Sequence, residues 1–259
     1  MSEPTLNFIA DVAQEAGHLI AHLRDKLDIS FKDGKELVTQ ADLAADERIR
    51  KRLQEAFPDH ALLSEELAPD ADKSARHLWV IDPIDGTVNF AHQHSQVAVS
   101  IAYYFEGNAR LAVVFNPFTH EMFTAEAGKG AWLNGQPLHC SVTVEMKRAL
   151  IATGFPYHKD NTAELIHRLG IILQNCADIR RLGSAALDIC WVACGRLDGY
   201  YETVKPWDFA AAQLIAREAG ASFGHFSPVP DGENPQLWGE DILISNPLLF
   251  AGLKNLLQS

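Results

Sequence analysis

The sequence lacks any apolar run that approaches the roughly 20 residues a helix needs to span a membrane. Its first residues, Met-Ser-Glu-Pro-Thr, also lack the basic stretch and apolar segment of a secretory signal. We therefore expect a cytoplasmic protein with no membrane partner.

Cysteine is scarce, with four residues in a chain of 259. They form no C-x-x-C pair, and no histidine cluster completes a zinc site with them. Their spacing does not suggest a disulfide framework. We interpret them as small core residues: Cys140, Cys176, Cys190 and Cys194.

Basic residues are few, with 22 Lys and Arg against 34 Asp and Glu, and the formal net charge is −12. This balance argues against a nucleic-acid partner, because a phosphate backbone requires a basic patch. It still permits an anionic substrate if metal ions held by carboxylates supply local positive charge. Carboxylate clusters are therefore the features of interest.

The first half of the chain predicts two helices followed by strands. Apolar residues at helical spacing predict helices over 6–27 and 42–57, and Thr39 or Asp42 is suited to cap the second. Short apolar runs predict strands over 61–63, 78–81, 97–104, 109–115 and 121–127. Asn134-Gly135 predicts a hairpin turn.

The second half alternates strands and helices. Strands are predicted over 150–153, 179–182, 199–201 and 242–245, and helices over 163–173, 185–193, 209–219 and 247–257. This order predicts layered α and β structure in two subdomains, residues 1–145 and 146–259, which form one catalytic unit.

An acidic turn is the most informative local feature. Asp82 and Asp85 follow a buried apolar run, and Pro83 and Gly86 favour a turn at that point. Two carboxylates three positions apart, with the carbonyl of Ile84 between them, suit a hard cation. The alternative is that both aspartates only form the turn.

Two further acidic positions stand at predicted strand and helix ends. Glu65 follows the apolar run 61–63, and Asp208 precedes a helix rich in small residues. The ordinary role of Asp208 is an N-cap. Spacing alone does not prove that these side chains meet Asp82 and Asp85.

Several motifs resemble those of the inositol monophosphatase family. Trp79-Val-Ile-Asp-Pro-Ile-Asp-Gly-Thr87, with Asn89-Phe90 after it, is similar to the first signature, and Trp207-Asp-Phe-Ala-Ala-Ala212 with Glu218-Ala-Gly-Ala221 is similar to the second. Other familial motifs stand in the expected order: 37–42, 64–66, 128–131, 153–156 and 181–186. The resemblance covers nearly the whole chain.

The resemblance implies an α+β fold, a layered α-β-α-β-α sandwich, and a lithium-sensitive phosphatase that uses metal-activated water. Its substrate would be a small polyol or sugar phosphate monoester, with inositol 1-monophosphate as the leading candidate. Two Mg²⁺ ions are implied, with a third and weaker ion near Glu65. The implied metal ligands are Glu65, Asp82, the carbonyl of Ile84, Asp85 and Asp208.

The resemblance also assigns catalytic and substrate-binding residues. Asp42, Glu65 and Thr87 would be catalytic, and Asp42 and Thr87 would orient the water. Backbone N–H groups at Gly86 and Thr87 would receive phosphate oxygens. The implied substrate-binding set is Asp85, Gly86, Thr87, Gly183, Ser184, Ala185, Glu202 and Asp208.

Other functions on the same scaffold stay open. Six positions separate Glu202 from Asp208, where many relatives have seven, so the end of the site that binds hydroxyls differs from the common pattern. The alternatives are histidinol phosphatase, fructose-1,6-bisphosphatase and 3′-phosphoadenosine-5′-phosphate phosphatase. A non-enzymatic regulatory partner is disfavoured by the complete acidic set.

The resemblance further implies a homodimer. Trp132, Phe155 and Tyr157 are candidates for its apolar surface, although they suit a core equally well. Lys32 or Lys35 could hold an ion or water near the site, but lysines in loops are usually solvated.

Overall fold

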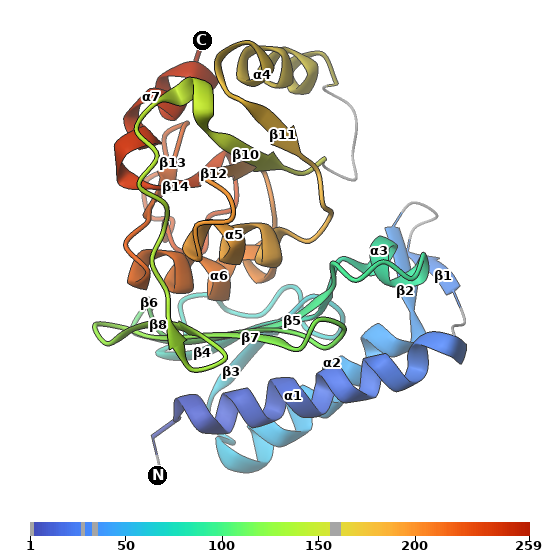
Figure 1. Ribbon diagram of the computed structural model, residues 1–259. Helices are drawn as coiled ribbons and strands as arrows, with labels where there is room; N and C mark the ends of the chain where they lie inside the picture. Colours follow the sequence, from blue (N-terminus) through green and yellow to red (C-terminus); the bar gives the residue numbers. More distant parts are fainter. Residues whose placement is uncertain (1–2, 27–28, 33–35, 156–161) are drawn as a thin grey trace.

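The computed structural model describes residues 3–26, 29–32, 36–155 and 162–259. Within these ranges, three helix pairs alternate with a seven-stranded and a five-stranded sheet (Figure 1). The order is helices, sheet, helices, sheet, helices. This confirms the α-β-α-β-α sandwich.

The first layer is formed by α1 (Leu6–Leu23) and α2 (Gln40–Ala56), which pack against each other. Residues of α1 at helical spacing, such as Ile9, Val12 and Ile20, are fully buried against the sheet. A 3₁₀ turn, η1 (Arg24–Lys26), follows α1, so the helix ends earlier than the predicted residue 27. A small hairpin, β1 (Ile29–Lys32) and β2 (Glu36–Thr39), which was not predicted, leads into α2.

The seven-stranded sheet keeps the order of the chain from β3 to β9. Its strands are β3 (Ala61–Ser64), β4 (His77–Asp85), β5 (Ala98–Phe105), β6 (Asn108–Asn116), β7 (Glu121–Glu126), β8 (Gly130–Leu133) and β9 (Gln136–Pro137). Only β3 and β4 run parallel among these neighbours. The predicted hairpin at Asn134-Gly135 joins β8 to β9.

Strand β4 is longer than predicted. It continues past Ile81 to Asp85, and its pairing with β5 shifts register between Asp82 and Asp85. Pro83 lies inside this shift and has no N–H to donate, so the irregular pairing accommodates it. The turn to the short helix α3 (Thr87–Ala91) therefore comes after Asp85.

The five-stranded sheet has the order β11-β10-β12-β14-β13. Its strands are β10 (Leu150–Thr153), β11 (Asp178–Arg180), β12 (Gly199–Glu202), β13 (Ser222–His225) and β14 (Ile242–Ser245). A 3₁₀ turn, η2 (Met146–Arg148), precedes β10. The outer helices are α4 (Thr162–Asn175) and α7 (Pro247–Leu257), and the inner pair is α5 (Ala185–Ala193) and α6 (Pro206–Glu218).

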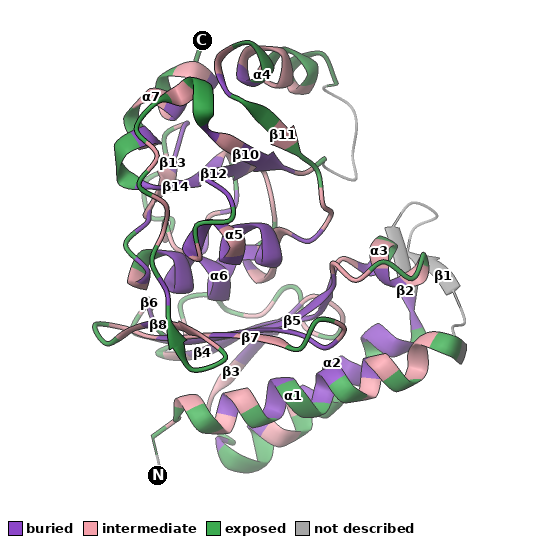
Figure 2. Cartoon of the chain, viewed as in Figure 1, coloured by how far each residue is buried: buried purple, intermediate pink, exposed green. Residues whose placement is uncertain are grey.

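The inner helices join the two sheets through one apolar core. Purple, buried segments concentrate in α5, α6 and the strands beside them (Figure 2). Tyr104 of β5 is fully buried, and its hydroxyl lies 3.2 Å from the carbonyl oxygen of Ala210 and 3.1 Å from that of Gln236. The Nε2 group of Gln213 donates to the same hydroxyl at 3.0 Å. Helix α6 is therefore fixed to the first sheet by polar as well as apolar contacts.

All four cysteines are free, which agrees with the absence of a disulfide framework. Cys176 and Cys190 are buried, whereas Cys140 and Cys194 are only partly buried. Among the described residues, no helix combines the length and apolar character needed to cross a membrane.

Candidate metal centre and active site

Three carboxylates from two distant parts of the chain meet between the layers. Asp82 and Asp85 lie on β4, and Asp208 lies in the first turn of α6. Each offers an oxygen atom within 4.8 Å of the others. The structure thus brings together three of the predicted ligands, and metal binding by them remains a prediction.

The carboxylate of Asp82 is at the centre of this cluster. Its side chain is almost fully buried, and burial raises its pKa well above the ordinary value. The negative charges of Glu65, Asp85 and Asp208 raise that pKa further. Neighbouring carboxylates repel one another unless protons or cations neutralise them. The oxygen-rich donor set therefore fits a hard divalent cation.

Glu65 and Ile84 adjoin the cluster. Glu65 follows β3 and shares a side-chain hydrogen bond with Asp82, although it is not one of the three mutually close carboxylates. The backbone N–H of Ile84 donates to Asp82 at 3.0 Å. The Ile84 carbonyl oxygen lies 3.1 Å from the hydroxyl of Thr87. Both predicted ligands thus border the same turn.

Asp42 and Thr87 form a buried pair beside this turn. Thr39 caps α2. The Oδ2 atom of Asp42 accepts hydrogen bonds from the backbone N–H of Thr39 at 2.7 Å and from the Thr39 hydroxyl at 2.5 Å. The other oxygen of Asp42 lies 3.1 Å from the Thr87 hydroxyl. Burial raises the pKa of Asp42, whereas its hydrogen bonds to Thr39 and Thr87 lower it. The predicted water-orienting residues are therefore in direct contact.

The carboxylate of Asp85 is held by the start of α5. It accepts hydrogen bonds from the Ser184 hydroxyl and from the N–H groups of Ala185 at 3.3 Å and Ala186 at 2.8 Å. Burial raises the pKa of Asp85 to about 6, and these hydrogen bonds limit the rise. Ser184 and Ala185 were predicted to contact substrate hydroxyls. The structure places both against Asp85, so their contact with substrate remains a prediction.

Glycine is required where β4 leads into α3. Gly86 has φ +96°, and a Cβ atom there would lie 2.7 Å from the carbonyl oxygen of Gln96 and 3.1 Å from that of Gly183. A side chain would be strained in this conformation and would meet two backbone oxygens. Gly86 therefore lets β4 and the loop before α5 approach closely.

Glu202 ends β12 in a narrow space. The Tyr200 hydroxyl donates to its carboxylate, and burial raises the pKa of Glu202 to about 7. A Cβ atom at Gly154 would lie 2.0 Å from a Glu202 oxygen, so any larger residue there would displace the Glu202 carboxylate. The residue as a whole is partly exposed, but its carboxyl group is enclosed by these neighbours.

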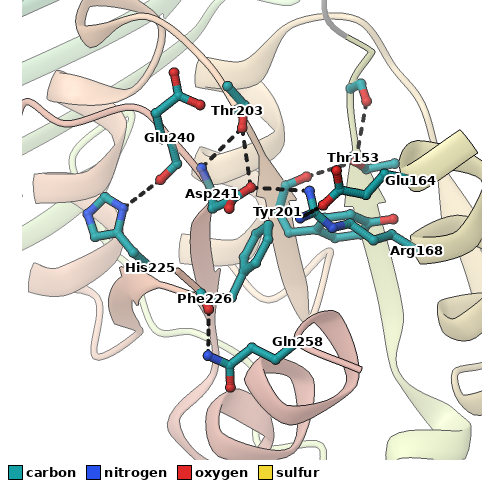
Figure 3. A network of polar contacts seen from close by, with 11 residues as sticks. Thr153, Glu164, Arg168, Tyr201, Thr203, His225, Phe226, Glu240, Asp241 and Gln258 are labelled. Atoms are coloured by element: carbon teal, nitrogen blue, oxygen red, sulfur yellow. Dashed lines mark hydrogen bonds and ion pairs between the residues drawn. The ribbon is translucent and has the colours of Figure 1, made fainter. Parts of the chain in front are cut away.

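A polar network fixes the chain around Glu202 (Figure 3). The hydroxyl of Thr153 donates to the carbonyl of Tyr201 at 2.8 Å, which ties β10 to β12. The N–H of Asp241 donates to the Thr203 hydroxyl at 3.1 Å, and Arg168 of α4 donates to the Asp241 carboxylate at 3.2 Å. The chain on both sides of Glu202 is therefore anchored by hydrogen bonds.

A cavity of about 100 Å³ connects the acidic cluster with Glu202. Most of the predicted substrate-binding residues line it: Asp85, Gly86, Gly183, Ser184, Ala185, Glu202 and Asp208. A larger hollow of about 370 Å³ lies over α2 and the residue Leu67, but none of the predicted site residues lines it.

Sequence reasoning missed two charged residues of this cavity, Arg181 and Asp188. Asp188 lies in the first turn of α5, where a single acidic residue in an apolar helix gave no periodic signal. Arg181 stood in the motif 181–186 but was given no role. Among the remaining predictions, Lys35 and Tyr157 lie outside the described residues, as does the side chain of Lys32.

Comparison with known proteins gives a consistent family assignment. The model of the inositol monophosphatase family matches residues 1–251. The Nus factor SuhB of Escherichia coli is 40% identical over 255 residues, which cover 96% of this chain and 94% of that protein.

Solved structures give the same result. The extragenic suppressor protein suhB of Bartonella henselae has a TM-score of 0.88 and 32% identity, with 98% of each chain covered. An inositol monophosphatase from Anabaena (Nostoc) has a TM-score of 0.83 and 31% identity, with 97% of this chain and 94% of that chain covered.

Proposed function

Because the chain belongs to the inositol monophosphatase family, we propose that it is a Mg²⁺-dependent phosphatase of small polyol or sugar phosphate monoesters. The observation that carries this proposal is the convergence of Asp82, Asp85 and Asp208, with Glu65 beside them. A scaffold without metal chemistry gains nothing from such a buried, mutually repelling set.

The carboxylates would hold two Mg²⁺ ions, with room for a third near Glu65. Bound Mg²⁺ would supply positive charge to the phosphate and activate the attacking water. The proposed ligands are Glu65, Asp82, the carbonyl of Ile84, Asp85 and Asp208. Their positions before binding are set by β4, the end of β3 and the start of α6.

Other residues of the chain orient the reactants. The Thr87 hydroxyl, held between Asp42 and the Ile84 carbonyl, is suited to orient a water molecule at the cluster. Gly86 leaves its N–H unobstructed by a side chain, and we assign it and the N–H of Thr87 to the phosphate oxygens. Glu202 is placed to accept a hydrogen bond from a hydroxyl of the leaving group.

Inositol 1-monophosphate is the leading substrate within this class. The Anabaena structure is named as an inositol monophosphatase, and it matches nearly the whole chain. A cavity that ends in a carboxylate suits a leaving group rich in hydroxyls. Histidinol phosphate, fructose 1,6-bisphosphate and 3′-phosphoadenosine 5′-phosphate are the alternatives.

The test is phosphate release from a panel of these esters and an aryl phosphate, with Mg²⁺ and with excess EDTA. We expect turnover only with Mg²⁺, highest kcat/KM on inositol 1-phosphate, and inhibition by Li⁺. Full turnover in excess EDTA would exclude the metal mechanism. Highest efficiency on another ester would replace inositol phosphate and leave the reaction class intact.

A second function is favoured by the name of the Escherichia coli relative, a Nus factor. We propose a regulatory role of that kind that uses a protein partner, because the net charge of −12 disfavours RNA. The test is whether an Asp82→Asn variant replaces the relative in cells that lack it. If the variant restores the function of the missing relative, the role is independent of turnover. If only the unaltered chain restores it, the role depends on turnover and the proposal is wrong.

A further inference from the structure

Asp188 is a buried carboxylate that the proposed reaction does not use. It lies on α5, its side chain is 1% exposed, and it lines the cavity that also contains Glu202. Its Oδ1 atom is buried and has no hydrogen-bond partner among the described residues. An unpartnered buried polar atom costs free energy, so this position calls for a ligand.

The surroundings of Asp188 show what kind of ligand fits. Burial raises its pKa well above the ordinary value; Asp85 and then Glu202 raise it further, whereas Arg181 lowers it. The guanidinium of Arg181 lies 5.3 Å from the ring centroid of Phe155, and both residues line the same cavity. Asp188 therefore shares this cavity with Asp85 of the acidic cluster and with Glu202, and the positive charge of Arg181 partly offsets their negative charges.

The chemistry of a carboxyl group narrows the ligand further. In either protonation state, Asp188 has an oxygen that accepts a hydrogen bond. A ligand that presents a hydrogen-bond donor in this cavity would therefore satisfy Asp188 in either state, provided that its phosphate lies at the proposed metal centre in the same cavity. Hydroxyl groups of a polyol meet this requirement, whereas the ring of an aryl phosphate has no donor.

We propose that Asp188 is a specificity-determining residue that accepts a hydrogen bond from a hydroxyl of the leaving group. This inference rests on the proposed phosphatase function and extends it. Glu202 and Asp188 together then recognise two separate hydroxyls, so the preferred leaving group is a polyol with at least two free hydroxyl groups. A leaving group with one hydroxyl would satisfy only one of the carboxylates.

The decisive measurement is the ratio of kcat/KM on inositol 1-phosphate to kcat/KM on p-nitrophenyl phosphate. We expect Asp188→Ala to lower this ratio by about 10–100-fold, mainly through a higher KM on the inositol ester. Asp188→Asn should lower it less, because its amide oxygen still accepts a hydrogen bond. Asp70→Asn, an exposed substitution in the loop between β3 and β4, is the matched control and should leave the ratio unchanged.

Two outcomes would overturn the proposal. An equal loss on both substrates in Asp188→Ala would mean that Asp188 supports the fold or the metal cluster, and an unchanged ratio would mean that it makes no contact. Circular dichroism shows whether the Asp188→Ala variant is folded before its rates are interpreted. If it is not folded, the nearly isosteric Asp188→Asn variant is measured instead.

Calorimetric titration of inositol 1-phosphate, with Ca²⁺ in place of Mg²⁺ and phosphate release first shown to be absent, tests the contact without turnover. Affinity at least about tenfold weaker in Asp188→Ala supports it, and equal affinity refutes it. The binding result tests only the contact of Asp188. The proposed function fails separately, if the unaltered protein releases no phosphate from any ester.

Discussion

The carboxylate of Asp82 is both the most strongly repelled group of the site and its central oxygen donor. It is buried among three other acidic groups, each of which raises its pKa. Without cations, this crowding opposes folding, because protons must replace the missing positive charge. When cations bind, the same closely spaced carboxylates provide the oxygen atoms that coordinate them.

Asp82→Asn is therefore predicted to lower kcat on inositol 1-phosphate and on aryl phosphate alike, by about 10³-fold or more. The replacement is nearly isosteric, so the fold should persist, and the metal-free variant should unfold at a higher temperature than the metal-free parent. Phosphate release and thermal unfolding in EDTA check both points. Near-normal turnover in Asp82→Asn would refute the proposed metal site. Asp70→Asn, which also removes one negative charge, is the control.

Glu202 gives a prediction for pH. Its pKa in the folded protein is about 7, above the ordinary 4.5, so the folded state binds this proton more tightly than the unfolded state. Its contribution to stability is complete below about pH 4.5 and is lost as the pH rises to about 7.

Relative to Glu202→Gln, the metal-free parent should therefore lose about 1–3 kcal/mol of unfolding free energy across this range, since water in the cavity reduces the full effect. Urea unfolding in EDTA at intervals between pH 4.5 and 7.5 measures the difference. Parallel curves for the two proteins would show that Glu202 has an ordinary pKa.

The start of α2 illustrates how the end of a helix positions a proposed catalytic group. Thr39 caps the helix and donates to Asp42, and Asp42 in turn contacts Thr87 on α3. One capping box thus links a helix end to the turn that carries the proposed metal ligands. The sequence predicted Thr39 or Asp42 as the cap, whereas the two residues form one capping box together.

Thr39→Ala should cost about 1 kcal/mol of stability, because the cap hydroxyl is lost. It should also lower kcat by a smaller factor than Asp82→Asn, because Asp42 keeps the N–H donor of residue 39 but loses the hydroxyl. Thr39→Ser retains the hydroxyl and serves as the matched variant. Chemical denaturation and initial rates measure the two effects, and an alanine variant as stable as the serine variant would contradict the capping role.

Much of the fold was predictable because its elements follow simple apolar periods. Strands β10 and β14 and helices α5 and α7 have the predicted bounds, and the other predicted elements occur within a few residues. The hairpin β1–β2, the short helix α3 and strand β13 were missed, because their residues mix polar and apolar types and form no continuous apolar run. The extension of β4 was missed because Pro83 and Gly86 indicate a turn, and local sequence does not reveal how β5 pairs beyond a proline.

The candidate site was only partly predictable for a related reason. Asp82 and Asp85 are neighbours in the chain, but their meeting with Asp208 depends on how α6 packs between the sheets. The engagement of Asp85 by the start of α5 likewise depends on tertiary contact. Asp188 was overlooked because it lies inside an otherwise apolar helix, where a single acidic residue gives no periodic signal.

The two sheets act as one body through α5 and α6. We retain the proposed division at residues 1–145 and 146–259 as a description of chain order, with one core shared between the parts. Most of the proposed metal ligands belong to the first part, and Asp208 belongs to the second. Activity should therefore require both parts together.

Association of two copies is a further prediction. Phe155 is 38% exposed and Trp132 is partly exposed, so both can contribute to a contact. We expect a homodimer with twice the chain mass of 28.6 kDa. Light scattering over a range of protein concentrations checks this, and a constant mass near 28.6 kDa would contradict it.

The anchoring of Tyr104 has a consequence for synthesis on the ribosome. Strands β3 to β9 are contiguous in the chain and are complete by residue 137, but the groups that enclose Tyr104 come from residues 210, 213 and 236. A nascent chain must therefore expose the inner face of its first sheet while about 100 further residues are added, which takes roughly 5–20 s. During that interval, the exposed apolar face is open to aggregation, so we expect folding during synthesis to benefit from chaperones.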